Sequence, residues 1–384
     1  MKYPLATPTW DQREYDAMQR VIDRGMFTMG EEVRAFETQF ATIVGSRYAV
    51  MVNSGSSANL LMMAAMLYRN DGALATGAEI IVPAVSWSTT YTPLQQLGYR
   101  VRFVDVDSGT LNIDEQQVEA AVTKDTRAIL AVNLLGNPAP LEQLSAIAQK
   151  HSLILLEDNC ESLGASVAGK QTGTWGVMGT FSFFFSHHIS TMEGGAVVTE
   201  DEELYHILLS LRAHGWTRQL PRENRLVKKQ TDGFFESFRF VLPGFNVRPL
   251  ELSGAIGRVQ LQKLPMFIKQ RRRNAEHFVS LFREDPRFRI QSEHGQSSWF
   301  GFSLIVRDES LSRDAIVKTL ANRDIECRPV VAGNFLRNPV MRYFDYSAYG
   351  NCPVADDIHE HGLFVGNSHE DIREQIDHLR RILA

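Results

Sequence analysis

The sequence contains few cysteines and no long apolar run. Its three cysteines, Cys160, Cys327 and Cys352, lie far apart and lack the C-x-x-C spacing of zinc and iron–sulfur sites, so we expect buried thiols, no disulfide framework and no metal. No stretch reaches the roughly 18 apolar residues that a membrane helix needs, and the N-terminal residues lack the apolar block of a signal peptide. We therefore expect a cytoplasmic protein that does not enter a membrane.

An excess of positive charge is also missing. The formal net charge is −5, which gives no reason to expect binding to nucleic acid or to an anionic membrane surface. The one basic run, residues 271–273, falls within a helix-like stretch, and we expect it to be a solvated helix face. With 384 residues and 44% hydrophobic content, the chain can bury a large core and form two domains.

Short apolar runs alternate with amphipathic stretches between Tyr48 and about Val198. Runs such as 48–52, 79–83 and 153–157 are almost continuously apolar, which is typical of parallel strands covered by helices on both faces. Further strands are expected at 101–105, 128–132, 180–185 and 195–199. The pattern predicts an α/β large domain built on a mainly parallel sheet.

The remainder of the chain predicts a smaller α+β domain. A helical pattern runs from about Pro249 toward Phe282, and we expect Pro265 to interrupt it. A strand over 298–306, a helix over 312–323 with Ser312 as its cap, and a terminal helix over 369–383 follow. We expect a large domain over residues 1–248 and a small domain over 249–384. The two should pack closely because no low-complexity linker separates them.

A serine-rich segment, residues 53–60, follows a strand and opens a helix. Backbone N–H groups and hydroxyls such as those of Ser56 and Ser57 can form an anion site at a helix N-terminus, because the first-turn amides lack partners and the helix dipole is positive there. Taken alone, the segment is explained at least as well by a serine-rich helix cap that binds no ligand as by an anion site.

Two further residues lie at strand ends, where open α/β sheets bind ligands. Trp87 follows the strand at 79–83 and either stacks on a flat heterocycle or fills the core. Asp158 ends a buried strand, and a carboxylate at that depth requires a partner. A protonated pyridine nitrogen is one such partner; the alternative is that Asp158 caps the following turn.

The most informative segment is Phe181 to Gly195, F-S-F-F-F-S-H-H-I-S-T-M-E-G-G, an apolar strand that ends in a polar turn. It resembles the lysine-bearing segment of the DegT/DnrJ/EryC1/StrS family of sugar aminotransferases, F-S-F-x-x-x-K-N-x-T-x-x-E-G-G. Counting back from the terminal E-G-G places His187 on the lysine and His188 on the next residue. The resemblance covers essentially the whole chain and includes residues 25–30 and 243–248.

The resemblance implies the aspartate aminotransferase-like fold, fold type I of the pyridoxal-phosphate-dependent transferases, with a mainly parallel large domain and a smaller α+β C-terminal domain. It also implies cofactor contacts: Asp158 to the pyridine nitrogen, Trp87 stacked on the ring, Glu161 near the ring hydroxyl, and Ser56, Ser57 and Ser182 on the phosphate. Asn246 would reach the phosphate of the neighbouring subunit. A homodimer with its active sites at the subunit interface is therefore expected.

Three residues are implied contacts of the substrate. Arg248 and Arg328 are expected to bind a carboxylate or a sugar nucleotide, because a guanidinium matches planar anions bidentately; surface ion pairs are the alternative. His214 is a weaker candidate. For His214 and for His188, a structural histidine with satisfied hydrogen bonds is the preferred interpretation.

A histidine in place of the lysine changes the expected reaction. Lysine binds the cofactor's aldehyde and also moves protons, whereas an imidazole can do only the second. We expect pyridoxal 5′-phosphate to be held non-covalently or as an adduct with an amino acid. L-Glutamate is expected to convert it to pyridoxamine 5′-phosphate, with His187 as the acid–base group. The implied enzyme is a lyase, a 3-dehydratase of a nucleotide-linked 4-keto-6-deoxy sugar. GDP-4-keto-6-deoxy-D-mannose is the expected substrate, in the synthesis of a 3,6-dideoxysugar such as the O-antigen sugar colitose.

Two other functions remain open at this point. One is an aminotransferase that tolerates the histidine and still delivers the amine to a keto-sugar. The other, from a different class, is a catalytically silent cofactor-binding homologue. Retention of Asp158, Glu161, Trp87 and the serines argues against the silent homologue.

Overall fold

The computed structural model describes residues 1–384 and is organised around an eight-stranded sheet. The strand order is β1-β9-β8-β5-β4-β2-β3-β13. All pairs from β8 to β13 are parallel, and β9 runs antiparallel to both of its neighbours. The strands are β1 (Tyr48–Val52), β2 (Glu79–Pro83), β3 (Arg100–Val104), β4 (Thr126–Val132), β5 (Ile154–Asp158), β8 (Met178–Ser182), β9 (Gly195–Thr199) and β13 (Tyr346–Ala348). The predicted mainly parallel α/β sheet is confirmed.

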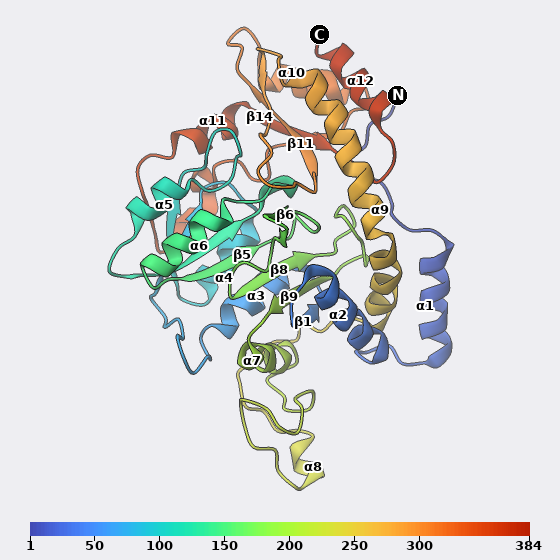
Figure 1. The fold of residues 1–384 in the computed structure, drawn as a ribbon, viewed down its shortest axis with the longest axis vertical. Helices are drawn as coiled ribbons and strands as arrows, with labels where there is room; N and C mark the ends of the chain where they lie inside the picture. Colours follow the sequence, from blue (N-terminus) through green and yellow to red (C-terminus); the bar gives the residue numbers. More distant parts are fainter.

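Helices cover both faces of this sheet (Figure 1). Side chains alternate between the faces along each strand: Ile80 and Val82 pack in one core cluster, whereas Ile81 packs in another. The first cluster contains residues of α3 and α7, and the second contains residues of α5 and α6. The helices of this part are α3 (Gly55–Ala65), α4 (Ser88–Gln96), α5 (Glu115–Ala121), α6 (Leu141–Lys150) and α7 (Glu202–Arg212).

A second, four-stranded sheet in the order β10-β11-β14-β12 forms the small C-terminal unit. Its strands and helices are β10 (Phe288–Arg289), β11 (Gly301–Val306), β12 (Cys327–Arg328), β14 (Gly362–Gly366), α10 (Arg313–Ala321), α11 (Pro353–His361) and α12 (Arg373–Ile382). Two segments cross the predicted boundary at residue 248, because Tyr3 bridges to Ile325 and β13 joins the large sheet. The domain division therefore stays a prediction.

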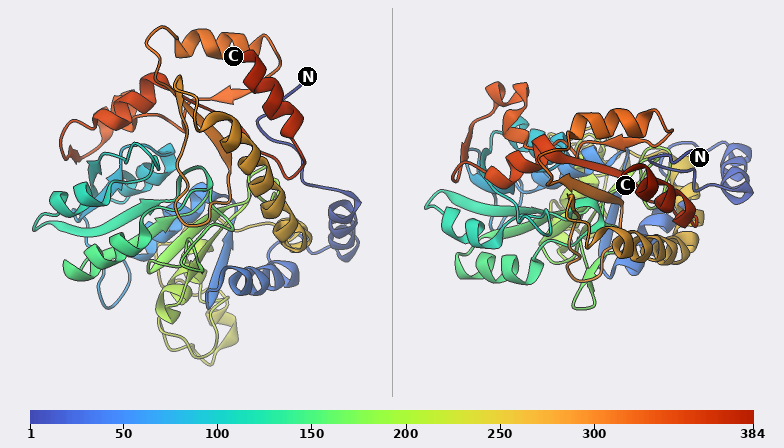
Figure 2. Two further views of the ribbon diagram at one scale, coloured as in Figure 1. Left: turned by 45° about the horizontal axis from the view of Figure 1, so that its top comes forward. Right: turned by 90° about the horizontal axis from the view of Figure 1, so that it is seen from above.

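One long helix, α9 (Glu251–Phe282), runs from the small unit down to α1 (Gln12–Arg24) and α2 (Glu31–Val44) (Figures 1 and 2). The predicted interruption at Pro265 is wrong, since the helix is continuous over 32 residues. A proline removes only one backbone hydrogen bond, and the packing of α9 against α1, α2 and α12 keeps the helix intact. The expected solvated face at 271–273 is also wrong in part, because Arg271 is buried.

Residues 213–248 form an arm that projects below the large sheet, with α8 (Gly233–Glu236) at its tip (Figure 1). Bridges from Ala213 to Asn246 and from Trp216 to Phe240 close its base. Four phenylalanines of the arm are more than half exposed: Phe234, Phe235, Phe238 and Phe240. Such a group of exposed aromatic side chains is typical of an interaction surface.

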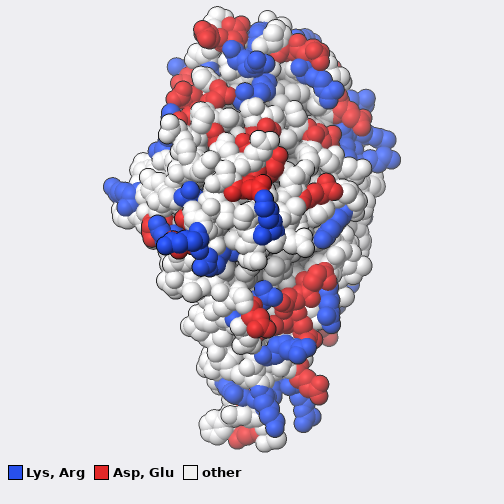
Figure 3. Space-filling model, turned by 60° about the vertical axis from the view of Figure 1, so that its left-hand side comes forward, with Lys and Arg blue, Asp and Glu red and all other residues white.

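The remaining short elements connect the main ones. They are β6 (Ser166–Val167), β7 (Lys170–Gln171) and the 3₁₀ helices Leu134–Gly136, Phe335–Arg337 and Pro339–Tyr343. The three cysteines are free thiols, with Cys352 buried and the other two partly buried. None of the helices combines the length and apolar character that crossing a bilayer requires. On the face drawn in Figure 3, positive and negative side chains are interspersed.

Candidate active site

The N-terminus of α3 forms a cradle of hydroxyls and free amides next to the end of β8. Ser54 caps the helix and accepts a 3.0 Å hydrogen bond from the amide of Ser57. A Cβ atom on Gly55 would lie 2.5 Å from the Cβ of Ser182, so only glycine allows this approach. The hydroxyl of Ser56 lies 2.9 Å from that of Thr89. The structure thus brings the three predicted serines into one region at a helix N-terminus.

Asp158 ends β5 as a buried carboxylate, 5% exposed. Its Oδ2 accepts hydrogen bonds from Asn59 Nδ2 at 2.8 Å and from Thr90 Oγ1 at 2.7 Å. Oδ1 accepts the amide of Cys160 at 3.2 Å, which is the turn cap considered from the sequence. These donors are neutral, so a buried negative charge remains without a cationic partner. That arrangement suits a protonated pyridine nitrogen.

Trp87 precedes α4 and is 56% exposed. The alternative that it fills the core is therefore wrong. An exposed indole just past the end of β2 offers a flat face at the edge where parallel sheets bind ligands.

Glu161 follows Asp158 by one turn and is partly buried. Its Oε2 accepts the amide of Leu135 at 2.9 Å. Burial raises the pKa of Glu161 to about 7, with the charge of Asp158 acting in the same direction and the Leu135 amide opposing them. The carboxyl group is thus poised to exchange a proton near neutral pH.

His187 lies in the turn after β8 and is partly buried. Its amide donates to the carbonyl of Phe184 at 2.9 Å, and its ring meets that of Phe300 edge-on, with centroids 5.1 Å apart. Burial, with a smaller contribution from the charge of Arg271, lowers the pKa of His187 to about 3. The imidazole is therefore neutral at physiological pH and can accept a proton.

His188 points into the core and is 1% exposed. Its Nε2 donates to the carbonyl of Ser298 at 3.1 Å, whereas Nδ1 has no partner. Burial holds the pKa of His188 well below its usual value. The expected satisfied hydrogen bonds are present at only one of its two nitrogens, and the structural role of His188 stays a prediction.

Asn246 and Arg248 lie at the base of the arm. Arg248 Nε donates to Asn246 Oδ1 at 3.0 Å, and the guanidinium carbon lies 5.9 Å from the centre of the Trp216 ring. The ring of His214 also contacts Trp216, with centroids 4.9 Å apart. The amide of Asn53 donates to the carbonyl of Val247, which ties the arm to the α3 cradle. Asn246 itself is exposed.

Arg328 ends β12 in the small sheet and is exposed. It donates to the carbonyl of its neighbour Cys327 rather than to a carboxylate. Its cross-strand partner is Phe364, whose ring lies 6.5 Å from that of Phe300. Arg328 is thus on the small-unit side of the site, and no direct contact joins it to the cradle.

Sequence reasoning missed the residues that hold the predicted ones in place. Asn59 and Thr90 orient Asp158, and Phe300 packs against His187. Asn59 carried a signal, since it is a polar residue within an otherwise apolar helix, one turn after Ser56. No local pattern predicts the contact of Phe300 with His187, because this contact depends on how the small unit meets the turn after β8.

These residues fit pyridoxal phosphate. The cradle supplies amides and hydroxyls for a phosphate, Asp158 supplies a carboxylate without a cationic partner, and Trp87 supplies an aromatic face. No lysine occurs between Lys170 and Lys228, so the turn at His187 offers no amine for the cofactor's aldehyde. A group held here would be bound without a covalent link to the turn.

Comparison with known proteins agrees with this arrangement. Residues 8–383 match the DegT/DnrJ/EryC1/StrS aminotransferase family. The chain is 57% identical, over the full length of both proteins, to GDP-4-keto-6-deoxy-D-mannose 3-dehydratase of Escherichia coli O55:H7. Two solved structures share 56% identity, a TM-score of 0.98 and full coverage of both chains: the E. coli dehydratase with bound hydrated PLP, and GDP-4-keto-6-deoxymannose-3-dehydratase with a trapped PLP-glutamate geminal diamine.

Proposed function

The chain belongs to the DegT/DnrJ/EryC1/StrS aminotransferase family, and on that premise we propose that it is a pyridoxal-phosphate- and glutamate-dependent 3-dehydratase of GDP-4-keto-6-deoxy-D-mannose. The observation that carries the proposal is that a histidine, His187, stands in the turn after β8 at the position where the resemblance places the family's lysine. The 57% identity to a dehydratase of that name supports the substrate. The hydrated and glutamate-bound cofactors of similar structures fit a cofactor that no lysine holds.

Bound pyridoxal phosphate would supply an electron sink for negative charge that develops beside the amino nitrogen. The chain's own residues supply the rest. Asp158 would hold the proton on the pyridine nitrogen, while Trp87 and the serine cradle would hold the ring and the phosphate. With the cofactor and glutamate bound, His187 would be the base for the proton on the α-carbon of glutamate and would donate it at C4′. With the keto-sugar bound, His187 would be the base for the proton at C4′ and the acid for the departing C3 hydroxyl.

Mass balance follows from this scheme. The sugar loses its C3 oxygen as water, and glutamate supplies the two electrons and becomes 2-oxoglutarate. A water molecule then releases the nitrogen as ammonia. The net reaction converts one keto-sugar and one glutamate into one 3-deoxy keto-sugar, one 2-oxoglutarate and one ammonia.

A turnover with ¹⁵N-glutamate and GDP-4-keto-6-deoxymannose tests the proposal. We expect labelled ammonium in equal amount to 2-oxoglutarate, and a sugar product lighter than its substrate by one oxygen. Label retained in the sugar would instead identify an aminotransferase. Absence of any turnover with bound cofactor would identify the silent homologue, although the fit of the site to the cofactor speaks against that outcome.

The proposal includes a homodimer in which Asn246 of one subunit contacts the cofactor phosphate of the other. Its support is the arm, whose exposed phenylalanines suit a protein interface, and the exposed position of Asn246 at its base. Arg248, Arg328 and His214 are proposed contacts of the substrate. The cytoplasmic location and the place in colitose synthesis stay predictions.

A further inference from the structure

The segment Ser297 to Phe300 of the small unit lies against both histidines of the turn after β8. The Phe300 ring meets His187 edge-on at 5.1 Å and His188 at 6.0 Å. The carbonyl of Ser298 accepts the hydrogen bond of His188. The segment therefore forms part of the packing around the His187 ring.

The 3₁₀ helix Leu134–Gly136, which follows β4, holds the segment from one side. The amide of Ser298 donates to the carbonyl of Gly136 at 2.8 Å, and the amide of Phe300 donates to that of Leu135 at 3.0 Å. Gly136 has a φ of +90°, and a Cβ atom there would lie 2.5 Å from the amide nitrogen of Phe300. Only glycine permits this close approach.

Arg271 holds the segment from the other side. Its Nη1 lies 3.4 Å from the carbonyl oxygen of Trp299 and 3.2 Å from those of Phe300 and Asn367. The side chain is 4% exposed, and its hydrogen bonds go to carbonyls and not to a carboxylate. Burying a cation without a counter-charge is costly. Trp299 has a φ of +50°, a conformation that bulky residues rarely adopt. These features indicate a backbone position held at some energetic cost.

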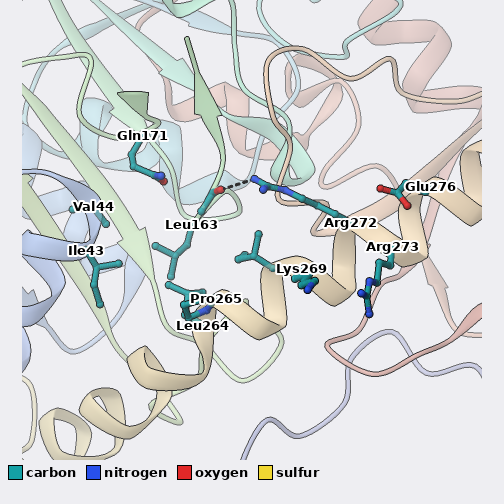
Figure 4. A pocket seen from close by; sticks show the side chains of 12 residues that line it. Ile43, Val44, Leu163, Gln171, Leu264, Pro265, Lys269, Arg272, Arg273 and Glu276 are labelled. Carbon is teal, nitrogen blue, oxygen red and sulfur yellow. Dashed lines mark hydrogen bonds between the residues drawn. The ribbon is translucent and has the colours of Figure 1, made fainter. Parts of the chain in front are cut away.

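The next two residues of α9 provide an internal comparison. Arg272 donates to the carbonyls of Ser297 and Gly164, and in Figure 4 it extends toward the Leu163–Gly164 turn. Arg273 is exposed and points away from that turn in Figure 4. The basic run therefore contains one buried arginine, one half-buried arginine and one that is solvated. Arg273 is the matched control for Arg271.

We propose that Arg271 is a positioning residue for His187: by binding the carbonyls of Trp299 and Phe300, it keeps the Phe300 ring against the imidazole and fixes the direction of that ring. The expected loss of catalytic rate rests on the proposed function, whereas the expected loosening of residues 183–191 and 297–301 does not. The buried charge has a second effect, because together with burial it lowers the pKa of His187. Removing the charge should raise that pKa, so the acidic limb of the pH profile should move to higher pH.

The test compares Arg271→Met, Arg271→Lys and Arg273→Met. In the cofactor-free protein we expect Arg271→Met to speed hydrogen exchange of the peptides covering 183–191 and 297–301, and Arg273→Met to leave it unchanged. In the holoenzyme, misplacement of a catalytic group typically costs up to about 100-fold. We therefore expect kcat of the glutamate half-reaction to fall about 10- to 100-fold in Arg271→Met, with KM for glutamate and cofactor affinity retained. Arg271→Lys should recover part of both losses.

Each outcome decides the inference. A folded Arg271→Met with native exchange would overturn it, and so would faster exchange with native kcat. If Arg271→Met does not fold, Phe300→Leu decides, since it removes the ring contact but keeps the arginine: a kcat loss of the same size supports the inference, and native kcat overturns it. If the wild type shows no glutamate half-reaction, the proposed function fails, and the exchange experiment still reports whether Arg271 holds the segment.

Discussion

The hydroxyl of Thr90 donates a 2.7 Å hydrogen bond to Oδ2 of Asp158, which joins the first turn of α4 to the end of β5. The same oxygen accepts the Asn59 side chain, whereas Oδ1 accepts only the amide of Cys160. A carboxylate oxygen can accept more than one hydrogen bond, so Oδ1 keeps capacity for a further donor. Two neutral side chains thus fix the orientation of the carboxylate and leave its charge uncompensated.

Replacing Thr90 by valine should weaken cofactor binding without unfolding the protein. The change removes the hydrogen bond to the Asp158 carboxylate, which is worth about 1.5–3 kcal/mol, and the hydrogen bond between the Thr90 and Ser86 hydroxyls. Asn59 still holds the carboxylate. We expect the dissociation constant of pyridoxal phosphate, measured by fluorescence titration, to rise about tenfold or more. Thr319→Val, on the exposed face of α10, is the control. An unchanged dissociation constant in Thr90→Val would show that Asp158 does not need this donor to bind the cofactor.

Borohydride should leave the holoenzyme without a covalent cofactor adduct. The reagent makes a lysine–cofactor bond permanent, and no lysine lies in the turn at His187. Intact-mass analysis after reduction should therefore show the unmodified chain. One adduct per subunit on Lys170, Lys228 or any other lysine would contradict the assignment of His187.

Parts of this arrangement follow from the sequence because they depend on local patterns. The apolar runs predict β1, β2 and β9 to the residue, since a strand buried on both faces must be continuously apolar. The strand-end position of Asp158 and the helix-capping serines are local features of the same kind.

Other parts depend on tertiary packing and leave no local pattern. Pro265 lies inside a helix because α9 is supported by its neighbours along its length. Arg271 is buried although the residues beside it are charged, because the carbonyls that accept its hydrogen bonds come from residues 299, 300 and 367. A single sequence shows neither the partners nor the burial.

Replacing His187 by asparagine should abolish proton transfer and leave the cofactor bound. Loss of a positioned acid–base group typically costs about 10²–10⁴-fold in rate, and binding depends instead on Asp158, Trp87 and the cradle. Conversion of pyridoxal to pyridoxamine phosphate by glutamate, followed by absorbance, measures the effect. His277→Asn is the control, because His277 lies on α9 and its ring hydrogen-bonds to Asp377 and not to a residue of the site. If His187→Asn still converts the cofactor at a near-native rate, another residue moves the proton, and His188 is the next candidate.

The Glu161 carboxyl group should make the cofactor-free protein less stable as the pH rises. Its pKa is raised from 4.5 to about 7 by burial, so between these values the folded state binds more protons than the unfolded state. Stability from this group is complete below pH 4.5 and is lost as the pH rises through 7. At about 1.4 kcal/mol per pKa unit, Glu161→Gln should gain up to about 3 kcal/mol at pH 8 and nothing at pH 4.5.

Urea unfolding of both proteins at the two pH values measures the difference. Glu276→Gln, an exposed position on α9, should change neither value. A Glu161→Gln variant with the same stability increment at both pH values would indicate that the gain does not come from the carboxyl's titration.

Mixing two inactive variants should restore activity if Asn246 acts across the subunit interface. Asn246→Ala alone removes a hydrogen bond to a charged phosphate and should weaken cofactor binding about 10- to 100-fold. In a mixed dimer of His187→Asn and Asn246→Ala, a site completed in trans has His187 from one chain and Asn246 from the other. One of its two sites is then intact and the other carries both changes. If Asn246 acts within its own subunit, every site carries one change and none is intact.

Random exchange makes half of the dimers mixed, and each mixed dimer has one intact site of two. At limiting cofactor, the mixture should therefore recover about a quarter of the wild-type rate. The recovery should require subunit exchange, which can be measured if the two variants carry different tags. A mixture that contains mixed dimers but stays inactive would place Asn246 in its own subunit's site. If the active wild-type protein sediments as a monomer, the dimer drops out of the proposal altogether. The exposed arm would then have no partner subunit whose active site it could complete.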